Sequence, residues 1–339
     1  MRITRRELVT AAAGAAAAGL VTAAPARAKS SGRPFRILML TYRGETDVER
    51  GFRDYLSASG RDFEFVARDA NRDPGKVADF LQEVPDLKPD LIYTWGTPIT
   101  LQTVGPYDAP DRARFVNDIP VVFALVAAPV KAKIAPAFAS SGRNVTGAVH
   151  VVPTDVQMRA LQSYRPAKTV GVLYSTTEQN SVAIVAELRA LLGAKDVKLV
   201  EQTFTLDAKG QPSAEGVADK VRQLKADGAE WLYLLPDTFL GTIYSQVTPV
   251  ARDAKLPTFG AAELAVREGG ALVGLVSRYY SVGQLAAQKA LDILVDGKKP
   301  SEVPIETLKR FSLIINMKVA KQLDAYPPIA MLDYAEVIT

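Results

Sequence analysis

The stretch "PDLIYTWGTPIT", residues 89–100, predicts the architecture of the whole chain. An apolar run of strand length leads into a polar turn, and Pro98 follows where the first turn of a helix accepts proline. The same order recurs in "AEWLYLLPDTFL", residues 229–240. Because strand, turn and helix in this order form the unit of a parallel sheet, the two stretches indicate two similar α/β halves.

Apolar runs of strand length extend this pattern in both directions. They occupy residues 36–40, 63–67, 91–95 and 121–126 in the first half, and 169–175, 198–204, 231–236, 257–261 and 271–277 in the second. Between them lie segments with apolar residues three and four positions apart, which are typical of amphipathic helices. We therefore expect an α/β fold of two doubly wound parallel-sheet lobes, whose strand ends converge on one cleft.

The first 28 residues differ in composition from the rest. Arg5 and Arg6 precede an Ala-rich run that ends in Ala26-Arg27-Ala28. This order indicates an export signal of the twin-arginine type, cut after Ala28, with a short cytoplasmic helix or membrane anchor as the alternative. Residues 1–28 hold four Arg and one Glu, so their removal lowers the formal net charge from +4 to +1, which is 37 Lys and Arg against 36 Asp and Glu. The chain has no Cys, so we expect a soluble periplasmic protein without disulfides or an N-terminal lipid.

The motifs of common enzymes are absent from the sequence. With no Cys, one His and no G-x-S-x-G turn, nucleophilic catalysis has no support. Neither a dinucleotide fingerprint nor a phosphate loop is present, and no polybasic stretch suggests nucleic acid. The single His150 is expected to be packed or solvated, because a metal site needs further ligands. We therefore expect no cofactor, no metal and no enzyme activity, although carboxylates of Glu45, Asp237 and Glu263 leave an exported hydrolase as a remote alternative.

Several motifs, taken in order, resemble one family. They are "IPVVFALVAAPV" (119–130), "NVTGAV" (144–149), "GVLYSTTEQNS" (171–181), "LYLLPDT" (232–238) and the long run 256–323, which ends in "NMKVAKQL". This order resembles the ABC-transporter substrate-binding proteins of the family with tryptophan- and tyrosine-binding members, over essentially the whole mature chain. The resemblance implies a type I periplasmic binding fold, whose two lobes close on a small solute and present it to an ABC permease in the inner membrane.

The resemblance also implies lobes that are discontinuous in sequence. The first lobe would comprise residues 33–146 plus 279–298, and the second residues 147–278 plus 299–339. The crossovers near Thr146-Gly147, Arg278-Tyr279 and Lys299-Pro300 would act as hinges. At the first of them, Gly147 would supply backbone freedom, and "NVTG" would not be an N-glycosylation acceptor.

Candidate ligand contacts in the first lobe follow two strand ends. Tyr42, Arg43 and Glu45 come after the first strand, where an aromatic ring can stack on a ligand and charged groups can either bind it or stay solvated. Thr46 is a good cap for the helix that follows. Thr97, after the third strand, offers a hydroxyl at a helix N-terminus, where a carboxylate can bind or the hydroxyl can simply cap.

The second lobe offers candidates after two of its strands. Tyr174, Ser175 and Asn180 surround the turn after the strand at 169–175. Asp237 and Phe239 follow the strand at 231–236, and Asp237 could either meet a ligand ammonium or cap the next helix.

Four further candidates depend on the resemblance or on the crossovers. Relatives commonly carry an Asp before the proline that follows the fourth strand, whereas this chain has Ala127-Ala128, so both are expected as backbone contacts only. Glu263 follows a strand of the second lobe, and Tyr279 lies at a crossover.

These candidates predict a periplasmic solute-binding component of an ABC importer. Its solute would be small and polar or zwitterionic, an amino acid or related compound, and Tyr42, Tyr174 and Phe239 are compatible with an aromatic ring. The alternative is a sensor that passes the same closure to a membrane receptor. The expected partners are the solute and the permease, and the protein is expected to be a monomer.

Overall fold

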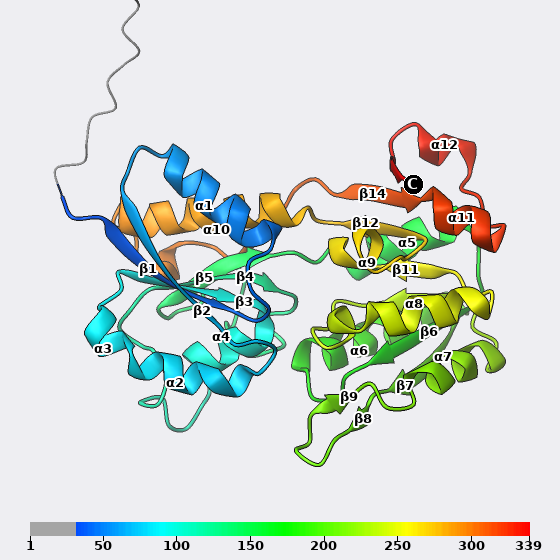
Figure 1. Ribbon diagram of the computed structural model, residues 1–339, viewed down its shortest axis with the longest axis horizontal. Helices are drawn as coiled ribbons and strands as arrows, with labels where there is room; N and C mark the ends of the chain where they lie inside the picture. Colours follow the sequence, from blue (N-terminus) through cyan, green and yellow to red (C-terminus); the bar gives the residue numbers. More distant parts are fainter. Residues whose placement is uncertain (1–31) are drawn as a thin grey trace, which may run out of the picture.

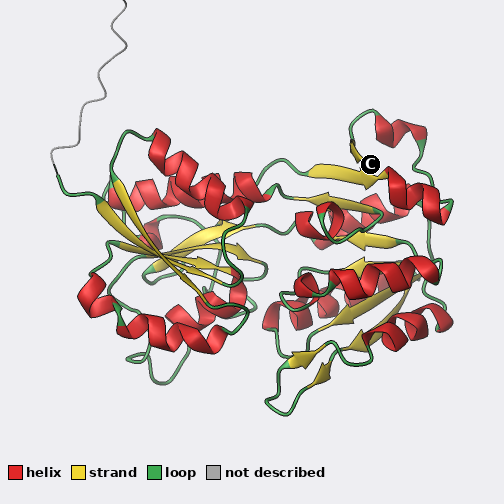
Figure 2. Ribbon diagram, viewed as in Figure 1, coloured by secondary structure: helices red, strands yellow, loops and turns green. Residues whose placement is uncertain are grey.

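The computed structural model describes residues 32–339, which form two α/β lobes lying side by side (Figure 1). The predicted export signal lies outside the described residues. In each lobe, helices cover a sheet of mostly parallel strands (Figure 2). The predicted fold class is confirmed.

The first lobe is built on a six-stranded parallel sheet of order β13-β5-β4-β3-β1-β2. Its strands are β1 (Phe35–Thr41), β2 (Phe63–Asp69), β3 (Leu91–Trp95), β4 (Val121–Val126), β5 (Val145–Val149) and β13 (Glu306–Thr307). Its helices are α1 (Asp47–Ala58), α2 (Val77–Gln82), α3 (Val84–Leu87), α4 (Gly96–Val104) and α10 (Tyr279–Leu294), with short 3-10 turns η1 (Pro74–Lys76) and η3 (Pro300–Glu302). The expected strands are present, and β3 and β4 are buried at every residue, as their continuous apolar runs require.

The second lobe is built on a seven-stranded sheet of order β15-β14-β12-β11-β10-β6-β7. Its strands are β6 (Thr169–Tyr174), β7 (Lys198–Thr203), β10 (Trp231–Leu234), β11 (Thr258–Gly260), β12 (Val273–Val276), β14 (Ser312–Asn316) and β15 (Glu336–Ile338). Its helices are α5 (Thr154–Tyr164), α6 (Gln179–Gly193), α7 (Val217–Ala226), α8 (Tyr244–Asp253), α9 (Glu263–Arg267), α11 (Met317–Leu323) and α12 (Ile329–Leu332), with the 3-10 turn η2 (Leu240–Thr242) and the hairpin of β8 (Thr205–Leu206) and β9 (Pro212–Ser213). Strand β14 arrives from the first lobe and runs antiparallel to β12.

Helices α1 and α10 pack backbone to backbone on the first lobe, where Figure 1 shows them side by side. An added Cβ at Gly283 of α10 would lie 2.0 Å from the carbonyl oxygen of Val48 in α1. An added Cβ at Gly51 of α1 would lie equally close, 2.0 Å, to the carbonyl oxygen of Tyr280. Only glycine allows this approach, so these two residues set the position of the helix that leaves the second crossover.

The chain passes between the two sheets three times, and two of these passages come later than expected. Strand β5 pairs with β4 over its whole length, so Thr146 and Gly147 lie inside the first-lobe sheet, and the crossover expected near them follows Val149. Strand β13 pairs with β5, so the crossover expected at Lys299-Pro300 follows Thr307. The middle passage lies between β12 and α10, at Ser277 and Arg278.

Candidate ligand-binding site

A small cavity of about 40 Å³ lies between the two lobes. The first lobe contributes Arg43, Trp95, Thr97, Leu125 and Ala127. His150 and Tyr279 come from the first and second crossovers. The second lobe contributes Asn180, Pro236, Asp237, Thr238, Gly241, Tyr244, Ala262 and Leu264. Both lobes therefore form the walls, and a ligand here would touch both.

Hydrogen-bond donors gather on the side of the first lobe. Trp95 stacks on Tyr42 with ring centres 5.7 Å apart, and the Arg43 guanidinium lies 4.9 Å from the centre of the Trp95 ring. Arg43 Nη1 also donates to the carbonyl of Gly241 in the second lobe, at 3.2 Å. The Trp95 indole Nε1 is buried and has no hydrogen-bond partner within residues 32–339. These groups offer a cation and an N–H donor to a ligand oxygen.

Helix α4 adds its positive end to the same wall. Its N-terminus follows Trp95, which makes no side-chain cap, and Thr97 in its first turn lines the cavity. At the far end, the buried guanidinium of Arg143 donates to the carbonyls of Val104 and Gly105, the latter at 2.8 Å. The carbonyls of Val104 and Gly105 are thus satisfied by the protein, whereas the first turn of α4 borders the cavity through Thr97, and a helix N-terminus favours negative charge.

The end of β4 is bent where it meets the cavity. Its register with β5 shifts between Ala124 and Val126, and Leu125 between them has a φ of 57°. A left-handed φ in a branched residue costs roughly 1–3 kcal/mol and marks a position held by its surroundings. The bulge brings Leu125 and Ala127 into the cavity wall, whereas Ala128, where relatives were expected to carry an acidic group, does not line the cavity.

Hydrogen-bond acceptors gather on the side of the second lobe. Asn180 donates from Nδ2 to the carbonyl of Pro236 at 3.0 Å, while its buried Oδ1 has no partner among the described residues. The buried Asp237 carboxylate accepts from the N–H groups of Ser175 and Leu240 and from the hydroxyl of Ser181, each at 2.8 Å. Asp237 thus stabilises the loop between β10 and η2. The hydrogen bond that it accepts from the Leu240 N–H is the helix cap expected from the sequence as one of its two roles. Its contact with a ligand stays a prediction.

A second carboxylate, which the sequence analysis did not select, supports the same loop. Glu178 accepts from the N–H groups of Thr238 and Phe239, both at 3.0 Å. Burial, followed by the nearby Asp237 carboxylate, raises the pKa of Glu178 to about 8. Burial likewise raises the pKa of Asp237. Two adjacent carboxylates therefore hold the loop that lines the second-lobe wall.

The raised pKa of Glu178 predicts that stability falls as the pH rises. A carboxyl whose pKa is higher in the folded protein than in the unfolded chain stabilises the fold fully below pH 4.5 and loses that contribution as the pH passes about 8. The free energy of unfolding should fall on the order of 1.4 kcal/mol per pH unit across this window. Chemical denaturation between pH 5 and 9 should show a flatter profile for Glu178→Gln. Glu45→Gln, an exposed control, should follow the wild-type slope, and equal slopes for all three proteins would contradict the assignment.

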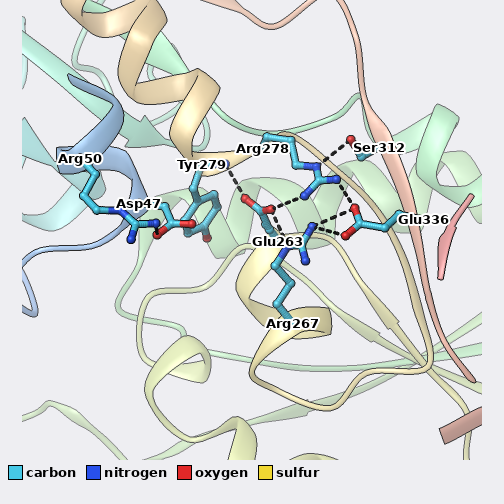
Figure 3. A network of polar contacts seen from close by, with 8 residues as sticks. All are labelled: Asp47, Arg50, Glu263, Arg267, Arg278, Tyr279, Ser312 and Glu336. Carbon is cyan, nitrogen blue, oxygen red and sulfur yellow. Dashed lines mark hydrogen bonds and ion pairs between the residues drawn. The ribbon is translucent and has the colours of Figure 1, made fainter. Parts of the chain in front are cut away.

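A charged cluster joins α9, the second crossover and the C-terminal strand (Figure 3). Glu263 Oε1 accepts from Arg267 at 2.7 Å and from Arg278 at 3.3 Å, and its other oxygen accepts from the N–H of Tyr279, the first residue of α10. Glu336 of β15 pairs with both arginines. Glu263, expected as a ligand contact, is thus occupied in holding the N-terminus of α10 at the hinge.

The thirteen candidate residues divide by position. Arg43, Thr97, Ala127, Asn180, Asp237 and Tyr279 line the cavity. Glu45 and Glu263 line an adjoining outer cleft of about 470 Å³. Tyr42 stacks on Trp95 and is not among the cavity-lining residues, and the carbonyl of Ala128 accepts a hydrogen bond from the N–H of Ala132 within its own turn.

Three aromatic or hydroxyl candidates of the second lobe do not line the cavity. The Tyr174 hydroxyl donates to Glu201 of β7, and Ser175 bonds to Thr177. Phe239 packs on Phe204 with ring centres 4.9 Å apart. All three residues lie at or after strand ends, as expected from the sequence, but their side chains contact the neighbouring strand and loop instead of the cavity.

Trp95, His150 and Tyr244 are cavity residues that the sequence did not indicate. Trp95 ends a fully buried strand and cannot be distinguished from a core residue in the sequence. His150 was expected to be packed or solvated, and it is buried, but in the wall of the cavity. Within residues 32–339, no three His, Cys, Asp or Glu side chains are placed to hold a metal ion.

Comparison with known proteins places the chain in one family. The family described as ABC transporter substrate binding protein matches residues 41–338. Among curated proteins, the "Tyrosine-binding protein" of Clostridioides difficile (strain R20291) is 25% identical over 277 residues, which are 81% of this chain and 73% of that protein.

Solved structures share the fold over nearly the whole chain. A conserved domain protein from Vibrio cholerae is 25% identical, with a TM-score of 0.78 over 91% of this chain and 100% of its own. The ABC domain in complex with L-Trp from Streptococcus pneumonia is 23% identical, with a TM-score of 0.77 over 90% of this chain and 100% of its own. The type I periplasmic binding fold implied by the resemblance is confirmed.

Proposed function

Because the chain belongs to the family of ABC transporter substrate-binding proteins, we propose that it binds an amino acid between its lobes and delivers it to a membrane permease. The family predicted from the sequence is the family found.

The observation that carries the proposal is the opposite polarity of the two cavity walls. The first lobe presents the Arg43 guanidinium, the Trp95 N–H and the N-terminus of α4, all of which suit a carboxylate. The second lobe presents the Asn180 carbonyl oxygen and the Asp237 carboxylate, which suit an ammonium group. A zwitterionic amino acid would satisfy both walls at once, and so would stabilise the closed arrangement over an open one.

The relatives support an amino acid as the solute. One is named for binding tyrosine, and one structure of the same fold contains L-Trp. In this chain the cavity wall includes the rings of Trp95, Tyr244 and Tyr279, which can pack against an aromatic or aliphatic side chain. We also propose that the N-terminal signal exports the protein, because a protein that delivers a solute to an importer must bind that solute outside the cytoplasm. None of the helices in residues 32–339 has the length and apolarity needed to cross a membrane.

Ligand-induced stabilisation tests the proposal. The protein should be purified without denaturation from its export compartment, and any co-purifying solute identified by mass spectrometry. Thermal unfolding with each of the twenty amino acids should then show one or a few that stabilise the protein, by about 2.7 kcal/mol at a hundredfold excess over the dissociation constant. Asn180→Leu should weaken the binding of that amino acid, because the substitution removes a buried hydrogen-bond acceptor for the ammonium group.

A failure of every amino acid to shift the melting temperature, in protein stripped of bound solute, would rule the proposal out. Gln162→Leu is the matched control for Asn180→Leu. Its amide bonds to Ala167 at the end of α5, outside the residues that line the cavity, so ligand affinity should stay within twofold.

A further inference from the structure

His150, the one histidine of the chain, lies where the cavity meets the hinge. It directly follows β5, on the first passage between the lobes. Its ring packs edge-on against Tyr279, the first residue after the second passage, with ring centres 6.1 Å apart and planes at 87°. Both rings line the cavity, so a ligand that touches them touches two of the three connections between the lobes.

The His150 ring has an unmet hydrogen bond. The side chain is 5% exposed, and its Nδ1 has no partner among residues 32–339. Burial, together with the Arg43 cation, lowers the pKa of His150 to about 3, so the ring is neutral at neutral pH. In a neutral ring Nδ1 either donates or accepts, depending on the tautomer. A buried polar atom left without a partner is unfavourable, and a partner supplied by a ligand would remove that cost.

Under the proposed function, the α-carboxylate and the α-ammonium of an amino acid both have partners among the cavity residues. Its carboxylate would meet Arg43 and the Trp95 N–H, and its ammonium would meet Asn180 and Asp237. That arrangement leaves His150 Nδ1 to the side chain of the ligand.

We propose that His150 determines specificity by forming a hydrogen bond from Nδ1 to a polar group on the ligand's side chain. The site would then select amino acids with a hydrogen-bonding side chain over hydrocarbon side chains of the same shape. This inference rests on the proposed function, because it assumes an amino acid in the cavity. A site that holds a buried polar atom for its ligand strongly rejects the analogue that lacks the matching group.

Matched ligand pairs and two variants test the inference by calorimetry. Tyrosine against phenylalanine, and threonine against valine, differ by one hydroxyl at nearly constant shape. For the pair that binds more tightly, the wild type should prefer the hydroxylated member at least tenfold. His150→Phe keeps a ring for Tyr279 and removes both nitrogens, so it should reduce the ratio of the two affinities below threefold, whatever its effect on each affinity alone. His150→Asn keeps a polar atom near the position of Nδ1 and should retain most of the preference.

Nitrogen NMR of the wild type gives a readout that does not depend on the variants folding. In tag-free protein labelled with ¹⁵N-histidine, the one imidazole gives the only pair of ring signals. Its Nδ1 signal should shift when the hydroxylated ligand saturates the protein and stay near its free position with the hydrocarbon analogue. Equal shifts with both ligands, or equal weakening of both by His150→Phe, would overturn the inference while leaving amino-acid binding intact. If none of the four ligands nor any other amino acid binds the wild type, the proposed function itself fails.

Discussion

Replacing Arg43 with methionine is expected to weaken amino-acid binding about a hundredfold, because a charge-assisted hydrogen bond to a ligand carboxylate contributes about 1.5–3 kcal/mol. Methionine keeps an unbranched side chain that can still cover the Trp95 ring, so the loss would report the charge and its N–H donors. The same change removes the bond from Arg43 Nη1 to the Gly241 carbonyl, which joins the two lobes beside the cavity. Isothermal titration calorimetry measures the effect directly.

Arg50→Met is the matched control for this prediction. Arg50 lies on α1 close to the outer cleft and pairs with the exposed Asp47. Exposed ion pairs contribute about 0–1 kcal/mol to stability, so the free energy of unfolding should change by no more than about 1 kcal/mol. The dissociation constant of the ligand should stay within twofold of wild type. If Arg43→Met also binds within threefold of wild type, the carboxylate does not meet Arg43, and the polarity assigned to the first-lobe wall is wrong.

Gly283→Ala is expected to destabilise the protein by about 3 kcal/mol, although alanine is the better helix former. The new Cβ would lie 2.0 Å from the Val48 carbonyl oxygen, which belongs to the backbone of α1 and cannot rotate away. The two helices must therefore separate, and α10 carries the residues of the second crossover at its N-terminus. Thermal and denaturant unfolding should both show the loss, and ligand binding should weaken with it, because α10 begins at Tyr279 in the cavity wall.

Gly193→Ala is the control for Gly283→Ala, because it makes the same change at a helical glycine and should not destabilise the protein. Gly193 is the last residue of α6, and an added Cβ there would meet no atom within 4 Å. Alanine should be neutral or stabilise by up to about 1 kcal/mol, because it restricts the unfolded chain. If both variants changed stability equally, the close approach of α1 and α10 would not be a determinant of the fold.

The fold could be predicted because its strands are continuous apolar runs of the right length, such as "LIYTW" and "WLYLLP". The first crossover could not, and Gly147 shows why. A glycine after Asn-Val-Thr was interpreted as a turn that needs backbone freedom. In the structure it lies inside β5, and an added Cβ would fall 2.3 Å from the carbonyl oxygen of Phe123 in β4. A glycine required for close packing and a glycine required for a turn are identical in sequence.

The sequence indicates which loops reach the cavity but does not indicate which side chains in those loops line it. Strand ends identify the loops that reach the cleft, and four residues selected on that basis, Arg43, Thr97, Asn180 and Asp237, line the cavity. Their contact with a ligand stays a prediction. Strand ends do not give the direction of a side chain, so Tyr174 and Phe239 were included although they pack on β7 and Phe204. Trp95 and His150 could not be selected, because a buried residue in a core and a buried residue in a cavity wall have the same pattern in sequence.

The three passages between the sheets have a consequence for biosynthesis. The first lobe lacks α10 and β13, and the second lacks β14 and β15, until the last part of the chain has been made. Until then the face of α1 that receives α10, and the strands that receive β13 and β14, have no partner. Pairings between segments so distant in sequence form late and slowly. Neither lobe can therefore finish folding before β13 has been made, and a chain truncated before β13 would leave both lobes incomplete.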